Sequence, residues 1–175
     1  MDSDGYLSQL ADIFNGITVN TPSISAIIAI VLAGVLLLAS GFASASEIAF
    51  FSLSPSDRND IDERNHPSDD KISALLGDTE RLLATILITN NFVNVTIIML
   101  CNFFFMNVFV FHSPLAEFLI LTVILTFLLL LFGEIMPKIY SAQKTLTFCR
   151  FSAPGIYFLE KVFRPIATVL VRSTT

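Results

Sequence analysis

Three long apolar stretches dominate the pattern of hydrophobic and polar residues along the chain. The first runs over Ile24–Phe51 and is broken only by small or hydroxyl residues and by Glu47. The second, Leu82–Phe111, carries five asparagines, and the third, Leu115–Phe132, is nearly unbroken apart from Glu117. A helix needs about 17–25 apolar residues to cross a bilayer. The pattern therefore predicts three membrane-spanning helices, over residues 24–53, 82–111 and 114–136.

Composition agrees with a membrane protein. Of the 175 residues 54% are hydrophobic and only 14% are charged, and the mean hydropathy is +0.73. A soluble domain carries about 25% charged residues. We therefore expect an all-α integral membrane protein. The first 20 residues hold three aspartates and no basic residue, and the apolar run after them is too long for a signal peptide, so we expect no cleavage there.

The basic residues predict the orientation. All ten lie between spans one and two or after span three: Arg58, Arg64, Lys71, Arg81, Lys138, Lys144, Arg150, Lys161, Arg164 and Arg172. With three spans both regions face the same side, and the positive-inside rule makes that side the cytoplasm. We expect a multi-pass protein of the cell membrane, with residues 1–23 extracellular, a three-span domain over 24–137, a cytosolic loop over 54–81 and a cytosolic tail over 138–175.

The tail alternates apolar and basic residues, and Pro154 and Pro165 interrupt it. None of its apolar stretches is long enough to span a membrane. It predicts juxtamembrane amphipathic helices on the inner membrane surface, with their basic side toward anionic headgroups. A soluble helical hairpin is the alternative. In the 54–81 loop, Lys71–Leu76 is expected to form a short helix.

The end of the third span combines a carboxylate with two helix-disturbing residues. In "FGEIMPK", residues 132–138, a helical Pro137 offers no hydrogen bond to the carbonyl four residues back, which belongs to Gly133. Glu134 lies beside that freed carbonyl. An intramembrane carboxylate is a candidate functional site, and exposed backbone at this depth needs protein or water beside it. The alternative is a simple helix end at which Glu134 pairs with Lys138.

The other two spans carry polar pairs at helical spacing. Ser40 and Ser44 share one face of the first span, and Asn90 and Asn94 share one face of the second. At about 1.5 Å per residue, Ser44 and Asn90 both lie roughly 12–14 Å inside the cytosolic ends of their helices. Close packing of small residues is the alternative for the serines, and interhelical hydrogen bonding is the alternative for the asparagines.

Hydroxyls, amide carbonyls, one carboxylate and one backbone carbonyl form an all-oxygen set, which suits a hard cation such as Mg²⁺, Ca²⁺ or Na⁺. Cys101, Cys149, His66 and His112 are too scattered for a zinc site, and the two cysteines are not expected to form a disulfide. The sequence contains no nucleophile elbow or phosphate-binding loop. We therefore expect a protein that is not an enzyme and has no nucleic-acid partner.

Three segments, "LASGFASASEIAFFSLS", "TNNFVNV" and "FGEIMPKIYSA", resemble signatures of the membrane domain of the CorC/cyclin M (CNNM) family of magnesium transporters. The resemblance covers roughly Ile24 to Arg172. It implies a three-span domain with a cytosolic juxtamembrane helical belt, a homodimer, and Mg²⁺ export coupled to Na⁺ entry. It also implies a CBS-pair domain, absent from this chain. The metal ligands that it implies are Ser40, Ser44, Asn90, Asn94, Gly133 (through its carbonyl) and Glu134.

Two other functions stay open at this point: an uncoupled Mg²⁺ channel or facilitator with the same ligands, and a non-transporting membrane sensor or scaffold whose polar residues serve packing alone. With one formal negative charge among six ligands, Mg²⁺ should bind weakly enough to be released. Two further acids lie in or near the spans. Glu47 is expected at the inner mouth or paired with tail cations, and Glu117 near the outer interface.

Overall fold

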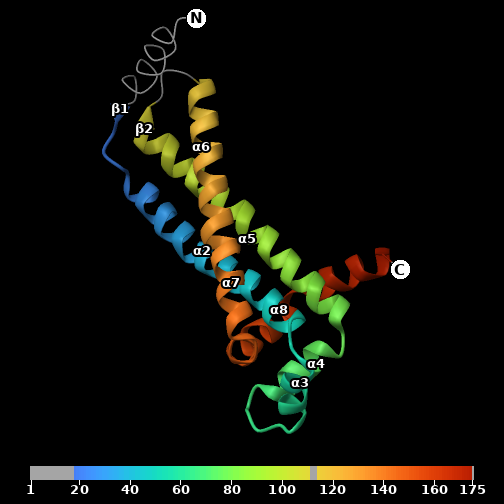
Figure 1. The fold of residues 1–175 in the computed structure, drawn as a ribbon. Coiled ribbons are helices and arrows are strands. Elements are labelled where there is room, and N and C mark those ends of the chain that lie inside the picture. Colours follow the sequence, from blue (N-terminus) through green and yellow to red (C-terminus); the bar gives the residue numbers. More distant parts are fainter. Residues whose placement is uncertain (1–17, 111–113, 175) are drawn as a thin grey trace, which may run out of the picture.

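The computed structural model describes residues 18–110 and 114–174, and three of its helical rods are long and apolar enough to cross a membrane (Figure 1). The first rod is α2 (Ile24–Phe51) and the second is α5 (Thr79–Val108). The third consists of α6 (Pro114–Leu128), the π-helix η1 (Leu129–Ile135) and α7 (Met136–Gln143). The predicted fold class, an all-α integral membrane protein with three spans, is confirmed. Residues 1–17 of the segment expected to be extracellular lie outside the described residues. Residues 111–113, between the second and third spans, also lie outside them.

Polar caps set where the spans begin. The Ser23 hydroxyl accepts a hydrogen bond from the Ala26 N–H at the start of α2. The Asp78 carboxylate does the same for the Arg81 N–H, so α5 begins at Thr79, before its first apolar residue. Capping groups of this kind satisfy backbone donors that have no partner inside the helix. The third rod continues past the predicted end at residue 136, through Pro137 to Gln143.

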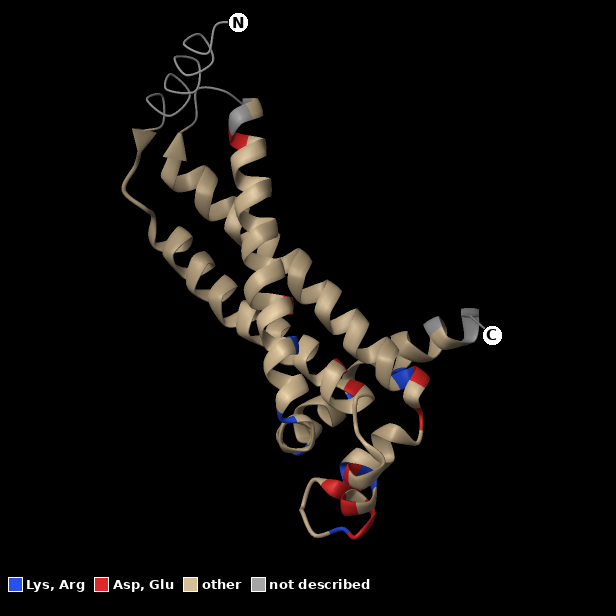
Figure 2. Ribbon diagram, in the orientation of Figure 1, with Lys and Arg blue, Asp and Glu red and all other residues tan. Residues whose placement is uncertain are grey.

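The remaining helices gather at the end of the molecule opposite the β1 and β2 strands (Figure 1). They are α3 (Pro55–Asp62), α4 (Asp69–Leu76) and α8 (Thr145–Thr174). Figure 2 shows that most charged residues collect at this end, while the long helices are largely free of them. The predicted short helix at Lys71–Leu76 corresponds to α4. The tail is amphipathic as expected, but Pro154 and Pro165 lie within one continuous helix.

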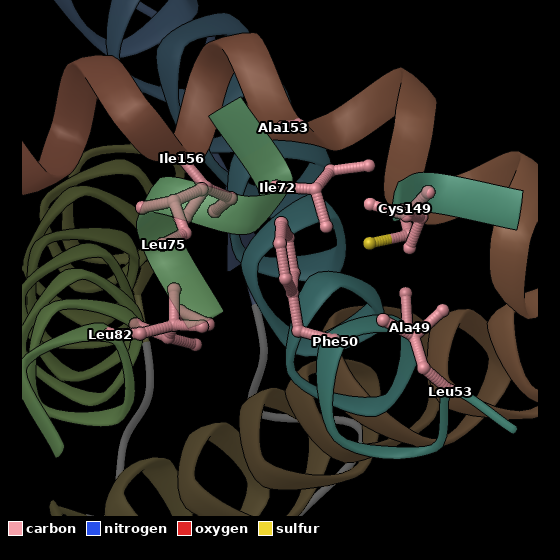
Figure 3. Packing of buried hydrophobic residues seen from close by; sticks show 11 residues of the cluster. Ala49, Phe50, Leu53, Ile72, Leu75, Leu82, Cys149, Ala153 and Ile156 are labelled. Carbon is pink, nitrogen blue, oxygen red and sulfur yellow. The ribbon is translucent and has the colours of Figure 1, made fainter. Parts of the chain in front are cut away.

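An inner core joins these helices to the ends of the spans (Figure 3). Its buried residues come from the end of α2, from α3 and α4, from the start of α5 and from α8, and they are Ala49, Phe50, Leu53, Ile61, Ile72, Leu75, Leu82, Ile86, Cys149, Ala153 and Ile156. Phe50, Ile72 and Ile156 have no exposed surface. Burying a side chain of this size stabilises the fold by about 1.5–3 kcal/mol. The loop helices and α8 therefore form one body with the inner ends of α2 and α5.

An ion pair reinforces this inner core. The Arg150 guanidinium of α8 donates to both oxygens of the fully buried Asp69 carboxylate, at 2.9 and 3.1 Å. The backbone N–H of His66 also donates to Asp69, at 3.0 Å. Burial alone would raise the pKa of Asp69, but these hydrogen bonds outweigh it and hold the pKa below its ordinary value. The neighbouring Cys149 thiol is buried, which raises its pKa to about 12.

The opposite ends of α2 and α5 are joined by backbone and side-chain hydrogen bonds. Strand β1 (Thr18–Val19) pairs antiparallel with β2 (Phe109–Val110). The backbone N–H of Ser23 also donates to the Asn107 side chain at 3.2 Å. These short strands were not expected from the sequence. They connect the start of the first span to the end of the second.

Candidate functional site

Ser40 lies at the centre of the polar cluster between the first two spans. Its hydroxyl is 2.8 Å from the Asn90 amide oxygen and 2.7 Å from the Asn94 amide oxygen, and Ser40 itself is fully buried. A hydroxyl has a single proton and can serve as donor to one good acceptor at a time. Three oxygens therefore converge on one proton. The spacing in the sequence put Ser44 at the depth of Asn90, but in the structure Ser40 contacts both asparagines and the Ser44 hydroxyl bonds to neither.

Ser44 lies one helical turn from Ser40 on the same helix, nearer to α3, α4 and α8. It is fully buried, and its hydroxyl has no hydrogen-bond partner. Leaving a buried polar group unpaired costs about 1–3 kcal/mol, so native proteins rarely do it without a reason. Among the described residues, Thr85 of α5 is the other buried side chain in this condition. Sequence reasoning missed Thr85, because a threonine in a helix commonly bonds back to its own backbone, as Thr89 does.

Gly133 brings the third span against the same cluster. It is buried, and a Cβ added at this position would lie 3.2 Å from the Ser40 hydroxyl oxygen. The backbone of η1 therefore approaches Ser40 as closely as a glycine allows. Of the predicted ligands, Ser40, Asn90, Asn94 and Gly133 come together, and Ser44 lies a turn away.

The backbone around Gly133 departs from the α-helical register on which the sequence argument rested. The Met136 N–H donates to the Leu131 carbonyl, five residues back, within a π-helical segment. Pro137, the next residue, has no N–H to donate, so one backbone hydrogen bond is missing where the π-helical segment passes into α7. The Phe132 carbonyl oxygen lies 3.3 Å from where a Cβ on Gly41 would stand. The sequence contains the proline but no signal for the extra residue in the turn. Such π-bulges are frequent at functional sites.

Glu134 is paired in this structure. Its carboxylate lies 3.3 Å from the Lys138 ammonium, which also lies 3.2 Å from the Glu47 carboxylate. This is the arrangement named above as the alternative for Glu134, and it also gives Glu47 the partner expected from the tail cations. All three side chains remain partly exposed. One ammonium is therefore shared by two carboxylates beside the serine and asparagine cluster.

A further contact fixes the third span to the first. The buried Ser141 hydroxyl of α7 donates to the Ala45 carbonyl of α2 at 2.6 Å. Sequence reasoning did not single out Ser141, since a lone serine near a span end has no periodic partner. Ala45 is the residue after Ser44, so this bond places α7 directly beside the lower part of the cluster.

The donor chemistry of the site is oxygen alone. Within residues 18–110 and 114–174, no group of three or more His, Cys, Asp or Glu side chains is placed to hold a metal ion. Hydroxyl and amide oxygens instead make up the cluster. Such ligands suit Mg²⁺, Ca²⁺ or Na⁺ rather than zinc or copper. The residues present therefore fit a weakly held hard cation.

The sequence of this chain is similar to one family model and to two curated bacterial proteins. Residues 28–175 match the family model described as the cyclin M transmembrane N-terminal domain. A UPF0053 protein of Haemophilus influenzae is 30% identical over 134 residues, which cover 77% of this chain and 31% of the relative. A UPF0053 protein of Synechocystis is 26% identical over 140 residues, which cover 80% of this chain and 39% of the relative. The chain thus spans about a third of the length of the curated relatives it matches.

Proposed function

Because this chain belongs to the cyclin M transmembrane family, whose members have a membrane role related to metal transport, we propose that it moves Mg²⁺ through the cluster around Ser40. We further propose that it exports Mg²⁺ in exchange for Na⁺. The observation that carries the metal site is the convergence of two amide oxygens on one hydroxyl, between helices that the third span touches at Gly133. Electron-rich oxygens gathered in this way are stabilised by a cation among them.

The proposed ligands are Ser40, Ser44, Asn90, Asn94, the Gly133 carbonyl and Glu134. Mg²⁺ demands near-octahedral oxygen geometry at about 2.0–2.1 Å and gives up its water reluctantly. In this proposal the unpaired Ser44 hydroxyl gains its missing partner from the ion. Glu134 turns from Lys138 to the ion, and Lys138 keeps its contact with Glu47. The ammonium therefore acts as a competitor that helps to expel the ion.

The rest of the proposal concerns the assembly and the membrane. The N-terminus is extracellular and the C-terminus cytoplasmic, since the basic residues lie with α3, α4 and α8. The chain acts as a homodimer, with its α8 on an inner leaflet that contains anionic lipids. Regulation by a CBS-pair domain, carried elsewhere in a longer protein, is part of the same proposal.

The deciding experiment is Mg²⁺ flux in liposomes that contain the protein, with and without an imposed Na⁺ gradient. An exchanger moves Mg²⁺ against its gradient only when Na⁺ flows the other way. Flux that ignores Na⁺ would identify a channel or facilitator instead. No flux, together with no effect of Mg²⁺ on thermal unfolding, would leave a sensor or scaffold. Glu134→Gln should abolish flux, whereas Asn91→Ala, on the exposed side of α5, should not.

A further inference from the structure

A second polar cavity lies away from the serine and asparagine cluster, where α8 passes the junction of α4 and α5. It has a volume of about 200 Å³. Three cations and two acids line it, together with Tyr157: Arg81, Lys161, Arg164, Asp78 and Glu160. In Figure 2 charged residues of both signs meet near this end of α5. The cavity shares no residue with the proposed transport site.

The acids of this cavity are already engaged by one cation. The Arg81 guanidinium lies 3.2 Å from Asp78 and 3.8 Å from Glu160. Lys161 lies over the Tyr157 ring, 4.9 Å from its centroid. Lys161 and Arg164 are both exposed, and no carboxylate of the described residues forms an ion pair with either. Two positive charges at the mouth of the cavity are therefore left for an anion.

The faces of α8 place this mouth at the level of lipid headgroups. Phe158, Val162 and Ile166 are 66%, 52% and 54% exposed and follow one another at four-residue spacing, so they form one apolar stripe. Lys161 lies on the edge beside that stripe, next to Phe158. Arg164 lies about 160° around the helix from Val162 and Ile166, nearer to the fully buried Ala167. A helix with adjacent apolar and basic edges lies in the membrane interface, with the basic edge among headgroups.

We propose that this cavity is a binding site for the phosphate of an anionic membrane phospholipid. Lys161 and Arg164 hold the phosphate, since ammonium and guanidinium groups form charge-assisted hydrogen bonds with its oxygens. The acyl chains continue along the apolar stripe of α8. A free phosphate would gain the same two charges but nothing from the stripe, which favours the lipid.

Thermal unfolding of the full chain in neutral detergent tests this proposal. A thiol-reactive dye reports unfolding, because Cys101 and Cys149 are both buried in the fold. Added dioleoyl phosphatidylglycerol should raise the Tm of the wild type, and phosphatidylcholine should not. A basic residue near an anionic surface contributes about 1 kcal/mol, so Lys161→Gln with Arg164→Gln should need about tenfold to thirtyfold more lipid for the same rise. Lys161→Arg with Arg164→Lys should behave like the wild type.

Arg58→Gln with Lys144→Gln removes the same charge from exposed cytosolic positions and serves as the control. Equal loss in this control would show diffuse attraction and overturn the proposal. Inorganic phosphate or glycerol phosphate giving the same rise at the same concentration would overturn the lipid as ligand. Should the double variant fold poorly, Arg164→Gln alone decides the question, with an expected loss of about fivefold. An unchanged response of a folded variant to phosphatidylglycerol also contradicts the site.

Discussion

At the scale of single residues, the main feature is that the Ser40 hydroxyl, a single hydrogen-bond donor, faces two acceptor oxygens. Two amide oxygens approach its hydroxyl within 2.8 Å, and one turn away the Ser44 hydroxyl has no partner. Interhelical hydrogen bonding, the alternative for the asparagines, accounts for the contacts of Ser40 but not for Ser44, where an alanine would fill the space without an unpaired polar atom. A bound cation accounts for both. Ser44 and the asparagines therefore offer a way to separate binding from folding.

Ser44→Ala and Asn94→Ala should each reduce Mg²⁺ affinity at least tenfold, since octahedral geometry leaves little slack to replace a lost ligand. In the absence of Mg²⁺, Ser44→Ala should unfold at the same temperature as the wild type or higher, because it removes a buried hydroxyl that has no partner. The Mg²⁺-dependent shift of the Tm measures both effects. Asn91→Ala, exposed on the same helix, is the matched control. Unchanged affinity in both variants would exclude the site.

Glu134 and Lys138 give a second prediction at this scale. Glu134→Gln should weaken Mg²⁺ binding, because it removes the one carboxylate among the proposed ligands. Lys138→Ala should strengthen it, because the ammonium that now lies 3.3 Å from Glu134 no longer competes with the ion. A Mg²⁺ titration of both variants checks the two directions. If the alanine variant loses affinity and the glutamine variant does not, Glu134 is only the ion-pair partner of Lys138.

At the scale of elements, the third span is interrupted where it meets the first. Leu129–Ile135 is π-helical, and Pro137 follows directly in α7. A Cβ added to Gly41 would lie 3.0 Å from the Pro137 ring and 3.3 Å from the Phe132 carbonyl. The backbone of α2 therefore needs a glycine at this crossing, and the π register of the third span is matched to it.

Gly41→Ala should lower the free energy of unfolding by about 1–3 kcal/mol, as overpacking of a tight contact usually does. Gly34→Ala is the control on the same helix, since nothing lies within 4 Å of a Cβ there. That variant should be neutral or more stable, because alanine favours a helix by about 1 kcal/mol over glycine. Thermal unfolding of the two variants side by side measures the difference. Equal stability would mean that the third span shifts freely against the first.

At the scale of the whole molecule, the ion pair between Asp69 and Arg150 joins the loop between the first two spans to α8. Asp69→Asn should cost about 2 kcal/mol, less than a fully buried pair, because the Arg150 side chain is still 23% exposed. The folded pKa of Asp69 lies below its ordinary value of 3.8. The contribution of the carboxylate is therefore complete above about pH 4 and is lost as the pH falls through the folded pKa.

The difference in Tm between the wild type and Asp69→Asn measures this contribution. It should stay constant from about pH 8 to pH 5 and shrink below about pH 4. Asp70→Asn is a suitable control, because Asp70 pairs with Arg64 on the exposed surface. A difference that grows on acidification would contradict the assignment.

The orientation is also a property of the whole chain. Asn20→Cys and Asn65→Cys both lie at exposed positions, beyond opposite ends of α2, and the native cysteines are buried. A membrane-impermeant thiol reagent applied to intact cells should label the first variant and not the second. Labelling of Asn65→Cys alone would invert the topology. It would also place the α8 cavity on the outer leaflet.

The sequence predicted the parts of this architecture that depend on periodicity. Spacing of four residues was enough to put each polar pair on one face of its helix, but not to show that Ser40 contacts both asparagines. The lengths of the apolar runs were enough for three spans. The π register around Gly133 was not predictable, because one extra residue in a turn leaves no compositional trace. The ion pair of Asp69 with Arg150 was hidden for another reason. Its partners lie 81 residues apart, and only the packing of α4 on α8 brings them together.

The two fastenings of α2 to α5 have a mechanical consequence. β1 with β2 joins the two helices at one end, and the inner core around Phe50 and Leu82 joins them at the other. Because the two helices are joined at both ends, we expect α2 and α5 to move together as one rigid unit. The third span is the least buried of the three and has no such fastening at its α6 end in the described residues. We therefore expect the third span to move relative to α2 and α5. Spin labels on α6 should change their distance to α5 when Mg²⁺ binds, while labels on α2 and α5 keep theirs.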